Sequence, residues 1–149
     1  MKLWASLYAV TWIIFVEFLL GTWPNPPGVV PYLHLVLGLG VVALTYNSFR
    51  LLRETRVPGR LKRIARATFG LSVFMVFLGF LIWFDVGARW TLPGVGYTVA
   101  QFFLFLHIVN AIAILAQAAA LGLAYDMWED REYDSATDPG EIPPMPTSR

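Results

Sequence analysis

The sequence predicts an all-α membrane protein, a bundle of four transmembrane helices in up-down-up-down order. The chain of 149 residues is 57% hydrophobic and only 14% charged, which is too apolar for an ordinary soluble domain. It contains four apolar segments, each near the roughly 20 residues that a helix needs to cross a bilayer. Most of the basic residues gather in one connection between these segments. These three observations predict the fold class.

The four apolar segments cover about residues 3–20, 32–52, 67–84 and 97–125. We expect helices because a backbone in lipid must satisfy its own hydrogen bonds. The first segment lacks an obvious small-residue cleavage site, so we interpret it as a retained helix. The fourth is longer and is expected to tilt or protrude. Residues 1–126 are then the transmembrane domain, and 127–149 an acidic, then Pro-rich tail that is expected to be disordered from about Ser135.

The connections predict the orientation of the bundle. Residues 21–28 are uncharged and rich in proline, and residues 85–96 have Arg89 as their only cation. The middle connection instead carries seven basic residues against one acid, namely Arg50, Arg53, Arg56, Arg60, Lys62, Arg63 and Arg66. The positive-inside rule places this connection in the cytoplasm. We therefore expect a multi-pass protein of the cell membrane with both termini cytoplasmic.

The only two histidines suggest an internal repeat. Placing His34 on His107 puts Gly38 on Ala111, and the preceding loops both contain a Pro-Gly-Val triplet after a tryptophan. This pattern indicates a parallel repeat, in which one two-helix hairpin is used twice in the same orientation. Chance similarity between apolar helices is the alternative.

The two histidines are predicted to lie at similar depth. His34 is sixteen positions before Arg50 (50 − 34), and His107 is nineteen before Asp126 (126 − 107). At about 1.5 Å per residue, their heights differ by only about 5 Å. Both then lie in the outer half of the membrane.

Two imidazoles at one depth on different helices suit the axial ligands of a six-coordinate haem b. Gly38 and Ala111, one turn after His34 and His107, would let the flat macrocycle approach the backbone. The alternative is that each histidine bonds a neighbouring helix or lies among lipid headgroups. A zinc or copper ion is disfavoured because two histidines without a third ligand make a poor site. The chain has no cysteine, which excludes thiolate metal sites and covalent haem attachment.

Two charged residues are further candidates. Glu17 lies deep in the first segment and is the candidate catalytic residue: it could orient a ligating histidine or carry a proton. The alternative is a carboxylate that reaches the membrane surface. Arg89 could pair with a haem propionate or with Asp85. The fourth segment also carries three side-chain amides, which are expected to bond neighbouring helices: Gln101, Asn110 and Gln117.

The chain resembles one half of a haem A synthase, on the residues His34 to Gly38 and on His107 within Leu106-His107-Ile108. The resemblance covers about residues 3–126. It implies four helices with a histidine early in the second and fourth, haem binding, and a haem-modifying or quinol-linked oxidoreductase. The family usually has a glutamate three residues before the first histidine and a basic residue after it. Here these positions hold Pro31 and Leu35.

Three functions remain open at this stage. The first is a b-type haem protein of the lipid bilayer, a cytochrome b that serves electron transfer or haem handling with a quinol or a respiratory partner subunit. The second is a compact haem A synthase-like enzyme that oxidises a haem methyl group. The third is a non-enzymatic accessory subunit of a respiratory complex, in which the histidines only pack. No motif in the sequence resembles a nucleotide loop, a catalytic nucleophile or a nucleic-acid-binding surface.

Overall fold

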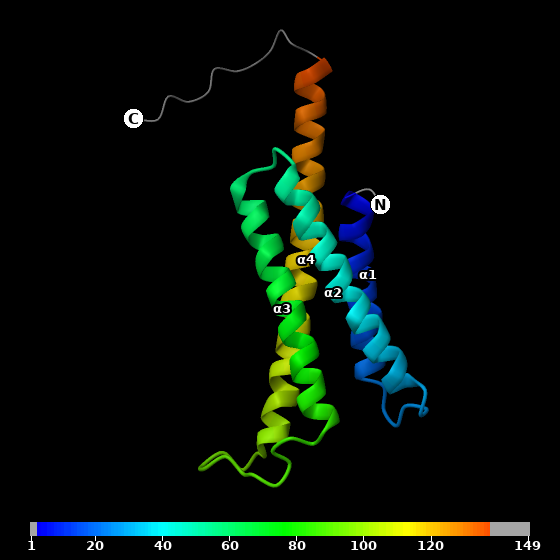
Figure 1. Cartoon of the computed structure of the whole chain (residues 1–149), viewed down its shortest axis with the longest axis vertical. Coiled ribbons are helices and arrows are strands. Elements are labelled where there is room, and N and C mark those ends of the chain that lie inside the picture. The colour runs from blue at the N-terminus through cyan, green and yellow to red at the C-terminus, as the bar shows by residue number, and fades with distance from the viewer. Residues whose placement is uncertain (1–2, 138–149) are drawn as a thin grey trace.

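The computed structural model describes residues 3–137, and this part of the chain forms a bundle of four helices. The helices are α1 (Leu3–Gly21), α2 (Val30–Glu54), α3 (Gly59–Trp83) and α4 (Val99–Thr137). All four are long and apolar enough to cross a membrane. The α1–α2 and α3–α4 connections lie at one end of the bundle and the α2–α3 connection lies at the other (Figure 1). The predicted all-α, up-down-up-down bundle is therefore confirmed.

The basic connection is shorter than its sequence suggests, because α2 and α3 extend into it and leave only residues 55–58 between them. Pro58 directly precedes α3, where its missing N–H costs nothing. The ammonium of Lys62 donates hydrogen bonds to the carbonyl oxygens of Arg53 (3.2 Å) and Thr55 (2.8 Å). These bonds satisfy carbonyls at the end of α2 that have no partner within the helix. We call this end of the molecule the basic end.

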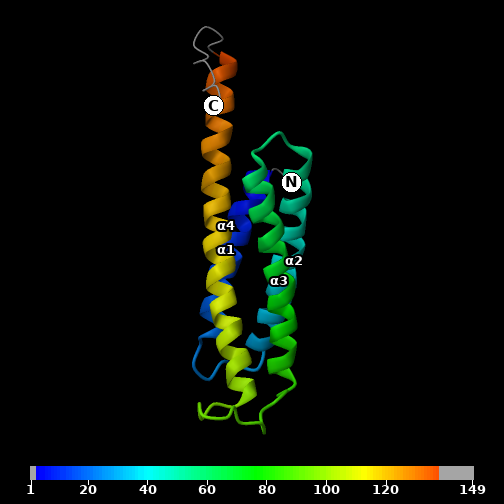
Figure 2. The ribbon, with the colours of Figure 1, turned by 90° about the vertical axis from the view of Figure 1, so that its left-hand side faces the viewer.

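Helix α4 is longer than the sequence predicted. Its 39 residues span about 58 Å, roughly twice the hydrocarbon thickness of a bilayer. It runs without a break through the expected domain boundary at residue 126 and projects beyond the other helices (Figure 1, Figure 2). The acidic segment is therefore helical as far as Thr137, and the rest of the expected disordered tail lies outside the described residues. The Tyr8 hydroxyl donates to the Asp126 carboxylate and ties α4 to α1 at this level.

Two apolar clusters form the core, and hydroxyl groups lie between and beside them. The cluster at the basic end consists of Leu7, Leu52, Val57, Leu61, Ala65, Leu121 and Tyr125. The central cluster consists of Val10, Ile14, Val41, Ile114 and Ala118. Three polar pairs join the helices at this depth: Ser6 with Ser48 (2.8 Å), Thr45 with Ser72 (2.9 Å), and Thr68 with Gln117 (2.9 Å). Such bonds connect transmembrane helices at about 1 kcal/mol or less each.

At the end opposite the basic end, the α1–α2 pair diverges from the α3–α4 pair (Figure 1). Helix α3 ends in a Schellman motif, in which Asp85 has φ 50° and its N–H bonds the carbonyl of Ile82. Helix α4 begins with a capping box: the N–H of Gln101 bonds the Thr98 hydroxyl, and the Thr98 N–H bonds the Gln101 side chain. Gln101 thus caps its own helix, and the prediction that it bonds a neighbouring helix was wrong.

Candidate functional site

His34 and His107 face each other near the diverging end of the bundle. Their ring centroids are 6.1 Å apart, and the ring planes are inclined at 52°. The helices that carry them, α2 and α4, are diagonal partners, because the bundle's helix contacts run α1 to α2, α2 to α3, α3 to α4 and α4 to α1. The two imidazoles therefore meet across the middle of the bundle, at a similar depth. An axis between two equivalent hairpins would bring the histidine faces together in this way.

Glu17 lies against the first of these histidines. Its Oε2 atom is 2.8 Å from Nδ1 of His34, and the residue is only 9% exposed. Nδ1 of His34 forms no hydrogen bond, so the contact with Glu17 is an electrostatic one at short distance. A carboxylate beside Nδ1 leaves Nε2 as the nitrogen that can take a ligand. Glu17 therefore points into the bundle and does not reach for the membrane surface.

The second histidine has a different environment. Nδ1 of His107 is buried and has no hydrogen-bond partner, and no carboxylate of the described chain forms an ion pair with this ring. One turn further along α4, the Asn110 amide donates to the carbonyl oxygen of Leu71 (2.9 Å). This bond links α4 to α3, as expected for a polar amide at this depth. The two histidines are thus unequal, because only His34 has an acidic neighbour.

Glycines of the preceding helices lie against both imidazoles. A Cβ atom at Gly21 on α1 would lie 3.3 Å from Cε1 of His34, and one at Gly79 on α3 would lie 3.5 Å from Cε1 of His107. Each histidine therefore packs against a glycine of the helix before it, which matches a two-helix unit used twice. The sequence did not point to Gly21, because it lies 13 residues before His34 (34 − 21) whereas Gly79 lies 28 before His107 (107 − 79).

The two small residues predicted to admit a macrocycle lie at the same level. A Cβ atom at Gly38 would lie 3.7 Å from Oε2 of Glu17, and Ala111 is buried. Arg89 lies exposed in the α3–α4 connection and forms no ion pair with Asp85, whose role is to end α3. Glu17 therefore lies between His34 and Gly38, and the pairing of Arg89 with a haem propionate stays a prediction.

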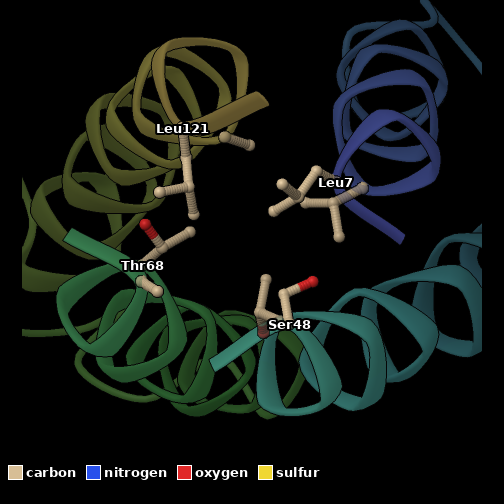
Figure 3. Close-up of a pocket in the computed structure, with 8 residues that line it drawn as sticks. Leu7, Ser48, Thr68 and Leu121 are labelled. Carbon is tan, nitrogen blue, oxygen red and sulfur yellow. The ribbon is translucent and has the colours of Figure 1, made fainter. Parts of the chain in front are cut away.

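An internal cavity lies elsewhere, among the hydroxyl pairs. Its volume is only about 10 Å³, and two residues of each helix line it, among them Leu7, Ser48, Thr68 and Leu121 (Figure 3). A cavity of this size has room for about one water molecule and for no cofactor. The described residues contain no group of three or more histidine, cysteine, aspartate or glutamate side chains arranged to hold a metal ion. The two imidazoles are therefore the strongest candidate ligands.

Comparison of the chain with protein-family models, with curated proteins and with solved structures gave no match. The functional argument accordingly depends on the geometry of the site.

Proposed function

We propose that this protein binds one b-type haem within the membrane, with His34 and His107 as the two axial ligands of the iron. The distance between their rings carries the proposal. An imidazole nitrogen binds a metal at about 2 Å, so two opposed bonds place the nitrogens about 4 Å apart and the ring centroids about 6 Å apart. The observed separation of the centroids is 6.1 Å. The rings would need little movement along the line that joins them.

The surroundings of the rings support the same assignment. Buried polar atoms without hydrogen bonds are costly, and three of them lie together here, on Glu17, His34 and His107. A bound metal would fix the ring orientations and strengthen the contact between Glu17 and His34. Gly21 and Gly79 let α1 and α3 approach the imidazoles closely. When bound, the haem supplies a redox-active iron, and ligation on both faces favours electron transfer over oxygen binding because no position stays open.

The charge distribution supports one orientation of this site. We infer that the basic end is cytoplasmic, which places both chain ends in the cytoplasm and the histidines in the outer half of the cell membrane. An electron donor such as a quinol, or a respiratory partner subunit, then meets the haem at the outer face. Because the chain has no cysteine, a single cysteine at Thr22 tests this orientation. A membrane-impermeant thiol reagent should label it from outside intact cells, and labelling only after permeabilisation would contradict it.

One observation favours the second candidate, a compact haem A synthase-like enzyme that oxidises a haem methyl group. The position three residues before His34, where the resemblance leads one to expect an acid, holds Pro31. Glu17 reaches the same histidine from α1 instead. A carboxylate at this place could carry a proton for the oxidation, as well as orient the ring. Analysis of the pigment extracted from the purified protein separates the two functions, because an enzyme would contain oxidised haem products.

A reduced-minus-oxidised visible spectrum of the protein in mild detergent tests haem binding. Sharp α and Soret bands that disappear in both His34→Ala and His107→Ala are the expected result. Asn110→Ala is the matched control, since it removes a buried polar group one turn from His107 but no proposed ligand. Full-strength bands in either histidine variant would contradict a shared iron. A protein that stays colourless after haem reconstitution would overturn the proposal and favour a non-enzymatic accessory subunit.

A further inference from the structure

A groove opens between α3 and α4 on the side of the bundle that would face the lipid. It lies near the basic end and away from the histidines. It has a volume of about 410 Å³, in the range of small-molecule sites. Its lining consists of Arg63, Ile64, Ala67, Ala116, Gln117 and Ala120. The small side chains of α3 and α4 create the hollow, and Arg63 and Gln117 make it polar. It therefore combines an apolar floor with hydrogen-bond donors.

We propose that this groove binds one anionic phospholipid. The Arg63 guanidinium takes the phosphate of the headgroup, and the groove takes the glycerol and the first part of an acyl chain. Arginine suits a phosphate because its planar donors can form two parallel hydrogen bonds. Basic pockets between transmembrane helices on the cytoplasmic side are a recognised setting for anionic headgroups. The proposal depends on the membrane location of the helices and does not depend on haem.

Arg63 and Gln117 both have hydrogen-bond donors that are available to a ligand. Lys62, the neighbour of Arg63, uses its ammonium on the carbonyls that end α2. Arg63 forms no ion pair with any residue between 3 and 133. The side-chain oxygen of Gln117 accepts a bond from Thr68, and its amide nitrogen has no acceptor in the described structure. Thr68 and Gln117 lie at the same level because their side chains are hydrogen-bonded. Arg63 precedes Thr68 by five residues on α3, so it lies about 7.5 Å closer to the basic end than Gln117 does.

This spacing matches the order of groups in a phospholipid, with the phosphate nearest the membrane surface and the ester oxygens below it. Charge argues against a second copy of the chain as the occupant. A two-fold interface on this face would bring two Arg63 side chains and their basic neighbours together, and like charges across an interface are unfavourable. An anionic lipid neutralises the same charges. The groove therefore suits an anionic lipid better than a self-association surface.

The test compares phosphatidylglycerol with phosphatidylcholine on the delipidated full-length protein, measured as lipid retained per protein by native mass spectrometry. We expect Arg63→Gln to lower retention of phosphatidylglycerol about fivefold, with little effect on phosphatidylcholine. Arg50→Gln is the matched control, because Arg50 lies at the same end, exposed and beside Glu54, outside the groove. Ala116→Leu should fill the groove and lower retention too, whereas Ala119→Leu, on the exposed surface of the same helix, should not.

Three results would overturn the proposal. Equal retention of both lipids by the wild type would show that charge plays no part. An equal loss in Arg50→Gln and Arg63→Gln would mean that the basic end attracts lipid diffusely. A wild-type dimer that becomes a monomer in Ala116→Leu would assign the groove to a second copy. The Arg63 variant changes an exposed side chain and keeps the test valid even where Ala116→Leu does not fold.

Discussion

We expect Glu17 to have two effects of opposite sign on this protein, and substitutions of Glu17 can separate them. Its Oε2 atom supports the His34 ring at 2.8 Å, whereas its Oε1 atom is buried without a hydrogen bond. The first contact should favour haem binding, and the unpaired oxygen should weaken the fold. We predict that Glu17→Met lowers haem affinity and at the same time stabilises the haem-free protein. A residue retained only for packing would not produce this combination.

The structure sets the expected magnitudes. Loss of a group that orients a metal ligand typically lowers metal affinity about 10–100-fold. Glu17→Gln keeps an oxygen near Nδ1 of His34 but removes its charge, and a neutral partner interacts about half as strongly as a charged one, so the loss should be about 10-fold. Glu17→Met keeps no acceptor, so the loss should approach 100-fold. Glu17→Met also removes the buried Oε1 atom that has no hydrogen bond, which should stabilise the haem-free bundle by about 1 kcal/mol.

Haem titration of the haem-free protein in detergent, followed at the Soret band, measures the affinity, and thermal unfolding of the same samples measures the stability. Glu54→Gln is the matched control, because its carboxylate is exposed at the basic end and pairs only with Arg50 at 3.7 Å. It should leave both quantities unchanged. Wild-type haem affinity in Glu17→Met would refute the reasoning, since the residue would then have no part in holding the ligand.

Two further predictions concern positions that the structure distinguishes. Gly79→Leu should abolish the haem spectrum because the new side chain would enter the space of the His107 ring. Gly70→Leu is the control on the same helix and should keep the spectrum, because no atom lies within 4 Å of a Cβ at Gly70. Equal spectra in the two variants would contradict the placement of Gly79. Thr98→Ala should destabilise the protein by about 1 kcal/mol, because it removes the hydroxyl that caps α4 at the N–H of Gln101. The midpoint of thermal unfolding measures this loss. An unchanged midpoint would show that the capping box contributes nothing.

The sequence predicted the fold because the bilayer limits the choice of structures. Apolar segments of about 20 residues in lipid can only be helices, and short connections make successive helices antiparallel neighbours. The height of each histidine followed from counting residues to the basic and acidic ends of the helices. The 6.1 Å approach of His34 to His107 is consistent with that count. Length and charge, which sequence shows directly, thus determined these features.

The contacts of single side chains were less predictable, because they depend on how each helix is rotated about its axis. The sequence left open whether Glu17 faces the membrane surface or the bundle, and only the packing of α1 on α2 brings it to His34. Gln101 was misassigned although Thr98-x-x-Gln101 is a recognisable capping box, because the helix was expected to begin at residue 97, two residues before its observed start at Val99. The alternative pairing of Arg89 with Asp85 was not found, since a loop cation has no periodicity from which its neighbours follow.

The division of the bundle explains how a site with unpaired buried polar atoms can persist. The larger apolar cluster and the cluster of hydroxyl pairs lie toward the basic end, where Leu52 and Leu121 are almost completely buried. The histidines lie near the starts of α2 and α4 and therefore at the other end of the bundle. The two hairpins diverge at that end (Figure 1). Stability from one end can therefore offset the cost of Glu17, His34 and His107 at the other, as is usual when a functional site violates a packing rule. Removing haem should then loosen the diverging end first. In amide hydrogen exchange, protection should fall around His34 and His107 while the α2–α3 end stays protected, and a uniform loss would show that the bundle unfolds as one unit.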